Sequence, residues 1–379
     1  MIPLIIFSSL ICLYYFLFAR IHNDRLLVYP INLGILNTLF LSASAVILMT
    51  ANRIGYDAVS FTRFFYFSRD HHANLFDYTY EILSNIIIAV TKFFPLMTYP
   101  VFHALVLVLT GLIFIRPLLK TYAVSLASVL SLYILSGVYA SDGMQFKNFI
   151  SVSILLYACY QLFKGGKSKL LAYYAWLLLA VLFHFSFAIY AFLPLILWKR
   201  LQKVSNLFPI IGSLLYLSLM LGIDGFKALI VLFAQVPFLA KLSIYASQTA
   251  GIRSIVPVGI YCLLLLLLEY YRRSNHFLTE DKQSLLVSTI YIWRLLGILL
   301  PALYFANAPY RLFRNVYLIV FLVATNIVLA SPIHTLTRIK NALFLLVVIF
   351  LIYMYPILLG QNIDIYSPVL DNGVFFWLE

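Results

Sequence analysis

Charged residues are scarce in this chain. They make up 10% of its 379 residues, whereas a soluble domain has about a quarter. Hydrophobic residues make up 64%, and long apolar runs recur from end to end. This composition excludes an ordinary soluble domain and predicts an all-α integral membrane protein that crosses the bilayer many times. We expect one transmembrane domain over residues 1–379.

Cysteines are also few, and Cys12, Cys159 and Cys262 all lie inside apolar runs. This excludes a disulfide framework and a cysteine metal site, and we expect no metal and no cofactor. The stretch "DHH" (70–72) is interpreted as a solvated loop, because adjacent residues on a helix point in different directions. Basic residues number 26 against 13 acidic ones, but they are scattered among short loops, so no nucleic-acid partner is expected.

Six short basic clusters interrupt the apolar runs: Arg20–Arg25, Arg116–Lys120, 164–169, 199–203, Arg272–Lys282 and 334–340. The positive-inside rule places all six in the cytoplasm, so the chain must leave and return between successive clusters. This predicts about twelve transmembrane helices (10–14), with both termini outside. The predicted spans are 2–19, 32–51, 99–115, 121–140, 148–163, 170–183, 185–198, 204–223, 254–271, 283–304, 314–332 and 341–359.

The apolar run from Leu170 to Trp198 is too long for one span, yet basic clusters flank it on both sides. Two short crossings or a re-entrant hairpin keep both clusters inside and place His184 near the outer turn. Short, broken helices at membrane depth are tolerated where they line protein or a water-filled cavity. We therefore predict that His184 faces a cavity that opens outward, although a histidine satisfied within the core is the alternative.

The largest external segments are predicted at about 52–98 and 224–253, and both are amphipathic enough to lie partly embedded at the interface. Cations on the outer side need a reason, because topology alone would keep them in the cytoplasm. We expect a cationic pocket for phosphate or pyrophosphate. Snorkelling at the lipid headgroups is the alternative for each side chain. The members of the pocket are Arg53, Arg63, Lys147, Arg311 and Arg314, of which the last two have i, i+3 spacing on one helix face.

Three stretches resemble the EpsG family of bacterial exopolysaccharide proteins, which is related to the Wzy-type repeat-unit polymerases. They are "RIGYDAVSFTRFF", the block from "MQFKNF" through "KGGKSK" to "HFS", and "PYRLFRNVY". In the middle block, members typically have a polar and basic start, a lysine-rich turn and an Ala-x-x-x-His-x-Ser step, here Ala180, His184 and Ser186. Lys147 stands where members usually have arginine, which keeps the charge but loses the bidentate geometry.

The resemblance implies a glycosyltransferase of the GT-C-like, metal-independent class in the bacterial inner membrane, with its active site facing the periplasm or exterior. Such an enzyme polymerises undecaprenyl-pyrophosphate-linked oligosaccharide repeat units into O-antigen, capsule or exopolysaccharide. Its implied partners are the lipid-linked donor and acceptor glycans, membrane lipids, a chain-length regulator and a flippase.

The residues fit this chemistry, since a pyrophosphate leaving group needs cations and an acceptor hydroxyl needs a general base. Histidine suits the second role because its side chain exchanges protons near neutral pH, so His184 is the predicted base and Asp57 its rival. The alternatives are a transporter or flippase, an O-antigen-ligase-like or metal-dependent GT-C enzyme, and an O-acyltransferase. The residues predicted to bind pyrophosphate or substrate are Arg53, Tyr56, Arg63, Lys147, Arg294, Tyr310, Arg311 and Arg314.

Overall fold

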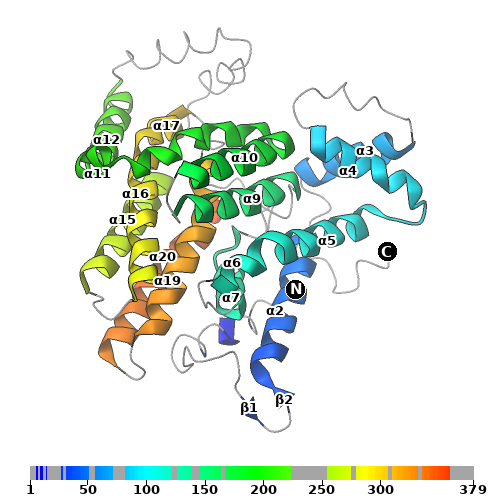
Figure 1. Ribbon diagram of the computed structural model, residues 1–379, viewed down its shortest axis with the longest axis horizontal. Helices are drawn as coiled ribbons and strands as arrows, with labels where there is room; N and C mark the ends of the chain where they lie inside the picture. The colour runs from blue at the N-terminus through cyan, green and yellow to red at the C-terminus, as the bar shows by residue number, and fades with distance from the viewer. Residues whose placement is uncertain are drawn as a thin grey trace. The chain divides into compact units, whose positions relative to one another are not determined.

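The computed structural model describes most of the chain, almost entirely as helix (Figure 1). The described residues are 6, 9–11, 14, 27–28, 31–50, 56–70, 82–121, 126–138, 146–163, 167–222, 254–274, 279–305, 310–331 and 335–358. The packing divides the chain into two compact units: unit 1 is Met1–Phe192 with Phe321–Glu379, and unit 2 is Leu193–Val320. Whether these units form one transmembrane domain, as predicted, stays a prediction.

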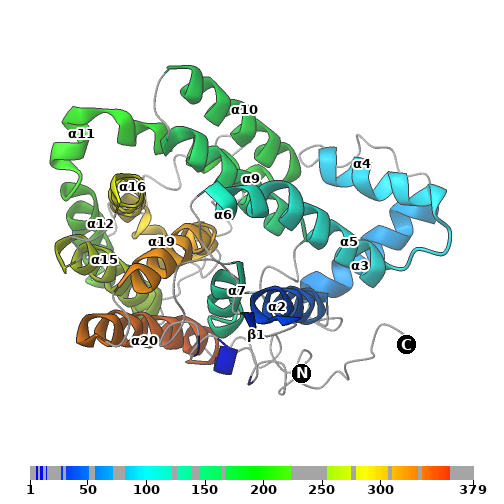
Figure 2. The same cartoon turned by 60° about the horizontal axis from the view of Figure 1, so that its bottom comes forward.

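Unit 1 is built from helices around a closely packed pair, α9 (Phe146–Phe163) and α10 (Lys167–Phe183), which lie side by side in both ribbon views (Figures 1 and 2). Ser151 Oγ on α9 donates a hydrogen bond to the carbonyl oxygen of Ala180 on α10 at 3.0 Å. The other elements are β1 (Leu27–Val28), β2 (Ile31–Asn32), α2 (Leu33–Thr50), α3 (Tyr56–Asp70), α4 (Ile82–Val90), η1 (Thr91–Phe93), α5 (Tyr99–Thr110), η2 (Gly111–Ile115), α6 (Arg116–Thr121), α7 (Leu126–Leu135), α20 (Leu336–Leu358), the first part of η3 (Phe185–Leu197) and the second part of α19 (Tyr317–Ala330).

Local sequence signals set several helix ends in this unit. Thr98 precedes α5 with extended backbone, and Pro100 occupies the first turn, where its missing N–H costs nothing. The π-helical turn η2 links α5 to α6, so that Tyr99–Leu119 forms one long apolar helix. β1 and β2 pair antiparallel over two residues each, the single strand pair among the described residues.

Unit 2 is built around the helix pair α15 (Ile255–Ser274) and α16 (Glu280–Leu296). Tyr261 Oη donates to the carbonyl oxygen of Trp293 at 2.9 Å, Trp293 Nε1 donates to the carbonyl oxygen of Tyr261 at 3.0 Å, and the two rings stack. This reciprocal contact sets the register of the pair. The other elements are α11 (Lys199–Val204), α12 (Leu207–Met220), η6 (Gly297–Leu299), α17 (Ala302–Phe305), α18 (Tyr310–Arg314) and the end of η3 with the start of α19.

Two helix boundaries in unit 2 follow from their residues. α16 begins after Thr279 and has Glu280 and Asp281 in its first turn, where negative charge is favourable. α12 ends at Met220, and Gly222 follows with φ of 79°, a left-handed conformation that glycine adopts without strain.

A described helix lies in each predicted span from 32–51 onward, so the all-helical prediction is confirmed for the described residues of these ranges. The predicted span 2–19 lies almost wholly outside the described residues. Five described helices are long and apolar enough to cross a bilayer: Tyr99–Leu119, Phe146–Phe163, Ile255–Ser274, Tyr310–Ala330 and Leu336–Met354. Other apolar helices, among them Ser168–Phe183 and Leu207–Met220, are shorter, so the count of about twelve crossings stays a prediction.

The predicted external segments are described only in part. For 52–98, the structure has α3 and α4, and the embedded position that we expected for this region stays a prediction. Residues 224–253 lie outside the described residues.

Candidate functional site

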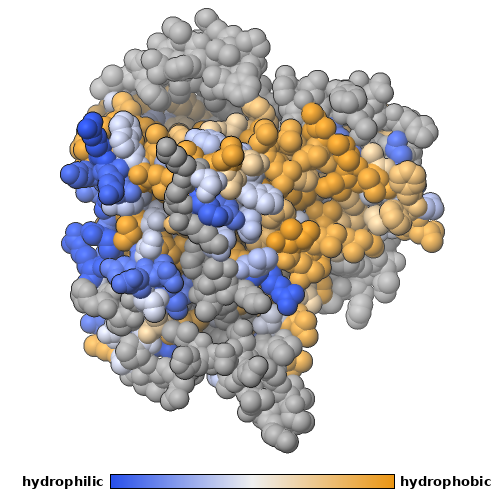
Figure 3. Space-filling view, viewed as in Figure 1, coloured by the Kyte–Doolittle hydropathy of each residue, from blue (hydrophilic) through white to orange (hydrophobic). Residues whose placement is uncertain are grey.

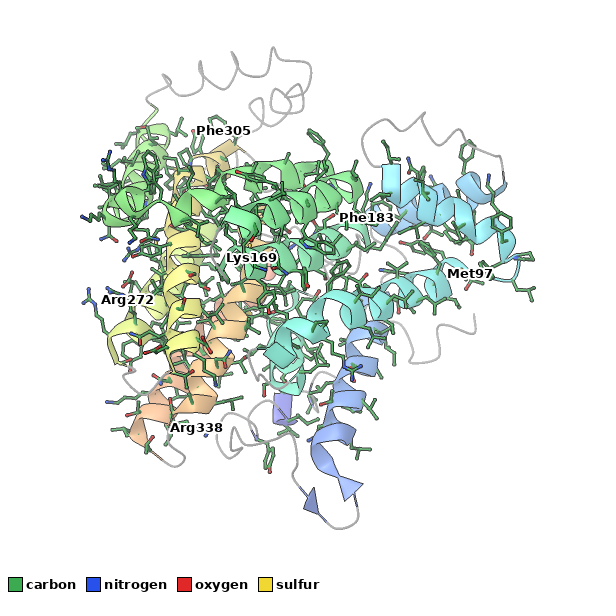
Figure 4. All side chains as sticks on the ribbon, in the orientation of Figure 1. Met97, Lys169, Phe183, Arg272, Phe305 and Arg338 are labelled. Carbon is green, nitrogen blue, oxygen red and sulfur yellow. The ribbon has the colours of Figure 1, made fainter. Side chains whose placement is uncertain are left out.

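Lys147 and His184 lie at the same end of the α9–α10 pair. The contact between Ser151 and Ala180 shows the register, because Lys147 is four residues before Ser151 and His184 is four residues after Ala180. Each of the two therefore lies one helical turn beyond this hydrogen bond, at the same end of the antiparallel pair. Figure 4 labels Phe183, which precedes His184, and Lys169, which lies at the opposite end of α10.

The chain reverses direction at His184. Tyr173 Oη, on α10, donates to the carbonyl oxygen of Tyr190, on η3, at 2.6 Å. A continuous α-helix would hold residues 17 positions apart at about 25 Å, so this contact requires η3 to fold back along α10. The predicted turn at His184 is thereby confirmed, while its position relative to a membrane surface stays a prediction.

His184 is half-buried and well supported at this turn. Its backbone N–H donates to the carbonyl oxygen of Ala180 at 2.9 Å, and its own carbonyl accepts from Phe187 N at 3.1 Å. The imidazole ring packs against Phe187, with centroids 5.9 Å apart, and Phe187 is fully buried. The backbone and one ring neighbour therefore restrict the position of the imidazole.

α3 packs against the Lys147 end of this helix pair. Lys147 Nζ lies 4.8 Å from the centroid of the Phe61 ring on α3, a cation–π contact, and Phe61 packs edge-to-face on Phe146 at 5.7 Å. Tyr56 and Asp57 form the first turn of α3, and Asp57 precedes Phe61 by four residues. The structure thus brings the α3 backbone that carries both predicted residues to the Lys147 end of α9. The side chains of Tyr56 and Asp57 lie outside the described part.

A buried aromatic cluster fastens α3 to α5 and α9. Phe65 lies 5.1 Å from Phe102 and 5.6 Å from Tyr99, and Phe102 lies 5.5 Å from Phe146, as ring centroids. All four rings are at most 7% exposed. Because Phe146 directly precedes Lys147, this cluster holds the backbone from which the Lys147 side chain extends.

His103 belongs to the same cluster, and sequence reasoning passed over it. Its ring lies 5.6 Å from that of Tyr99 and 6.3 Å from that of Phe146, and the residue is 3% exposed. Its Nε2 has no hydrogen-bond partner among the described residues. The sequence did contain a signal for His103, because it is an ionisable residue inside the predicted span 99–115. Such residues are by default candidates for a functional role.

Two further cations were predicted for this region, Arg53 and Arg63, and the structure describes only Arg63. Arg63 is an exposed side chain on α3. Arg53 lies outside the described residues, and so do His71 and His72. Among the residues that the structure describes, no three His, Cys, Asp or Glu side chains come together to hold a metal ion.

The remaining predicted site residues belong to unit 2. Arg311 is exposed on α18, whereas Arg314 is only 8% exposed, so their i, i+3 spacing does not give them a common exposed face. Tyr317 Oη donates to Tyr310 Oη at 2.8 Å, and both tyrosines are buried. The ring of Tyr317, at the start of α19, also packs on that of Trp293 at 5.9 Å. Phe313 on α18 packs on Tyr261 at 5.5 Å and on Trp293 at 6.3 Å, which places α18 against the α15–α16 pair.

Arg294 has an acidic partner inside unit 2. Its Nη2 forms an ion pair with Glu269 Oε1, and its Nη1 donates to Ser205 Oγ at 2.9 Å. Glu269 also pairs with Arg272, at 2.9 Å. Glu269 thus serves both arginines, and the predicted role of Arg294 in substrate binding stays a prediction. Sequence reasoning missed Glu269, for which the signal was a lone acidic residue near the end of a predicted span.

The chemistry available at the Lys147 end of the α9–α10 pair follows from its two side chains. An ammonium group donates charge-assisted hydrogen bonds to phosphate oxygens, and an imidazole accepts the proton of a hydroxyl group. Exposed Arg63 lies on the adjoining helix α3. This end of unit 1 therefore combines an ammonium group with an imidazole.

The profile of the EpsG family matches residues 34–367, which is nearly the whole chain. No curated protein and no solved structure matches the chain.

Proposed function

Because the chain belongs to the EpsG family, we propose that it is a membrane glycosyltransferase of the Wzy type, acting on the outer side of the bacterial inner membrane. It polymerises undecaprenyl-pyrophosphate-linked oligosaccharide repeat units into a surface polysaccharide. The observation that carries this proposal is the placement of Lys147 and His184 at one end of α9–α10, with α3 packed against it.

In the proposed reaction, a hydroxyl of the acceptor glycan attacks the anomeric carbon of the donor. A new glycosidic bond forms, and the bond from that carbon to the pyrophosphate oxygen breaks. His184 accepts the hydroxyl proton, with Asp57 as the rival base, and undecaprenyl pyrophosphate leaves with the bonding electron pair. Lys147 and Arg63 stabilise the negative charge that develops on the pyrophosphate.

The predicted substrate-binding role of the unit 2 residues is kept on the strength of the family resemblance alone. Among them, Arg311 is exposed, whereas Arg294 already forms an ion pair with Glu269. Tyr310 and Arg314 are buried on the same short helix α18, and Tyr310 is hydrogen-bonded to Tyr317. Arg53 and Tyr56, the first residue of α3, complete the predicted set.

The test is reconstitution of the purified full chain into liposomes with the lipid-linked repeat unit of its own polysaccharide, labelled by a fluorophore. The proposal predicts a ladder of products that differ by one repeat unit, with release of undecaprenyl pyrophosphate. Movement of the labelled lipid between leaflets without chain extension would instead identify a flippase. Transfer of the glycan to another lipid without a ladder would identify a ligase, and acylation an O-acyltransferase.

A further inference from the structure

α11 presents three basic side chains on one face. Lys199, Arg200 and Lys203 are all exposed, and their spacing places them on the same side of the helix. Within the part of the chain that the structure describes, no carboxylate forms an ion pair with any of them. Figure 3 shows hydrophilic side chains gathered over α11 and over the end of α15 that carries Arg272, which Figure 4 labels.

Hydrogen bonds hold α11 against other parts of unit 2. Gln202 Nε2 donates to the carbonyl oxygen of Ile196 at 2.5 Å, and Ser205 Oγ, just after the helix, accepts from Arg294 at 2.9 Å. Arg294 is anchored in turn by Glu269. The three cations therefore lie on a helix that is held in place. Binding of a ligand then needs little loss of backbone conformational entropy.

The basic face is followed directly by an apolar one. Trp198, just before α11, is 55% exposed, and tryptophan is enriched at membrane interfaces. α12 then exposes a stripe at helical spacing, and the sequence from Lys199 to Gly222 contains no acidic residue. The stripe consists of Leu207, Ile210, Ile211, Leu214 and Leu217, each more than two-fifths exposed.

We propose that α11 and α12 together bind an anionic phospholipid, independently of the proposed enzymatic function. The phosphate headgroup contacts Lys199, Arg200 and Lys203, and the acyl chains lie along the apolar stripe of α12. In a phospholipid, a charged headgroup is joined to apolar acyl chains, which matches the basic side chains of α11 next to the apolar stripe of α12. An acidic protein would bind the basic side chains but leave the apolar stripe uncovered. The cluster 199–203 is predicted to be cytoplasmic, where the leaflet surface carries negative charge that attracts basic segments.

The experiment is native mass spectrometry of the full chain in detergent with equimolar phosphatidylglycerol and phosphatidylcholine. The variant is Lys199→Gln/Arg200→Gln/Lys203→Gln. The control Arg116→Gln/Lys169→Gln/Lys340→Gln removes the same charge from unit 1. We expect wild type and control to retain phosphatidylglycerol preferentially, and the α11 variant to bind it more weakly by at least about tenfold.

Two results would overturn the proposal. Equal retention of the two lipids by the wild type would show that the face does not select negative charge. Undiminished retention of phosphatidylglycerol by the α11 variant would place the lipid elsewhere. A poly-glutamate peptide is added in a separate arm, and its binding to α11 in place of the lipid would assign this face to an acidic protein.

Discussion

At the scale of single residues, the ion pair between Arg294 and Glu269 shows how a buried charge is tolerated in a membrane protein. Both side chains are less than one-fifth exposed. Removing either one would leave a buried charge without its partner and would destabilise the fold. Arg294 was predicted to bind substrate because it is an ionisable residue inside a span. The structure shows that Arg294 ties the turn after α11 to α15, while its role in substrate binding stays a prediction.

Glu269→Gln should destabilise the protein by about 1–3 kcal/mol, because it leaves the guanidinium of Arg294 without a compensating charge. The measurement is the thermal unfolding midpoint of the purified protein in detergent. Glu280→Gln, an exposed acid at the start of α16, is the matched control and should shift the midpoint much less. Adding Arg294→Met to Glu269→Gln should recover part of the loss. An unchanged midpoint in Glu269→Gln would show that the pair does not stabilise unit 2.

At the scale of elements, the close contact between α12 and η6 in unit 2 depends on two glycines. A Cβ on Gly212 of α12 would overlap the carbonyl oxygen of Gly297 in η6, and a Cβ on Gly297 would lie 2.6 Å from Pro209 Cα. Small residues let backbones approach in this way where helices pack in a membrane. α12 and η6 therefore cannot keep their present separation if either glycine gains a side chain.

Gly212→Ala is expected to push α12 away from η6 and to cost about 1–3 kcal/mol, as overpacking does elsewhere. Gly259→Ala on α15 is the control, because a Cβ there meets nothing within 4 Å and alanine favours the helix. The comparison uses thermal unfolding midpoints of the two variants in the same detergent. If both variants unfold at the same temperature, α12 and η6 do not approach as closely as described.

Much of this helical layout is readable from the sequence, for identifiable reasons. The reversal at His184 follows from a run too long for one span between two basic clusters, and the Tyr173–Tyr190 contact bears it out. The Arg294–Glu269 pair was not predictable, because spacing along a chain does not reveal how α15 and α16 rotate against each other. The aromatic cluster around Lys147 was equally hidden, since aromatic residues make up 17% of the whole chain.

At the scale of the whole molecule, the predicted alternation of membrane crossings determines which residues face the outside and which face the cytoplasm. Cysteines introduced into a cysteine-free background by Asp142→Cys and Asn307→Cys should react with an impermeant reagent added outside. Those introduced by Gly166→Cys and Leu201→Cys should react only from inside. Because the last two flank the α10–η3 reversal, labelling them from opposite sides would contradict the hairpin crossing and the outward position of His184.

The central claim is that lipid-linked glycans are joined at the end of α9–α10 that carries Lys147 and His184. The most direct test is the rate of ladder formation by reconstituted Lys147→Ala and His184→Ala beside Lys169→Ala, which removes a lysine from the opposite end of α10. We expect both site variants to lose at least about 100-fold in rate while remaining folded, and Lys169→Ala to match the wild type. Ladder formation at the wild-type rate by both site variants would contradict the account.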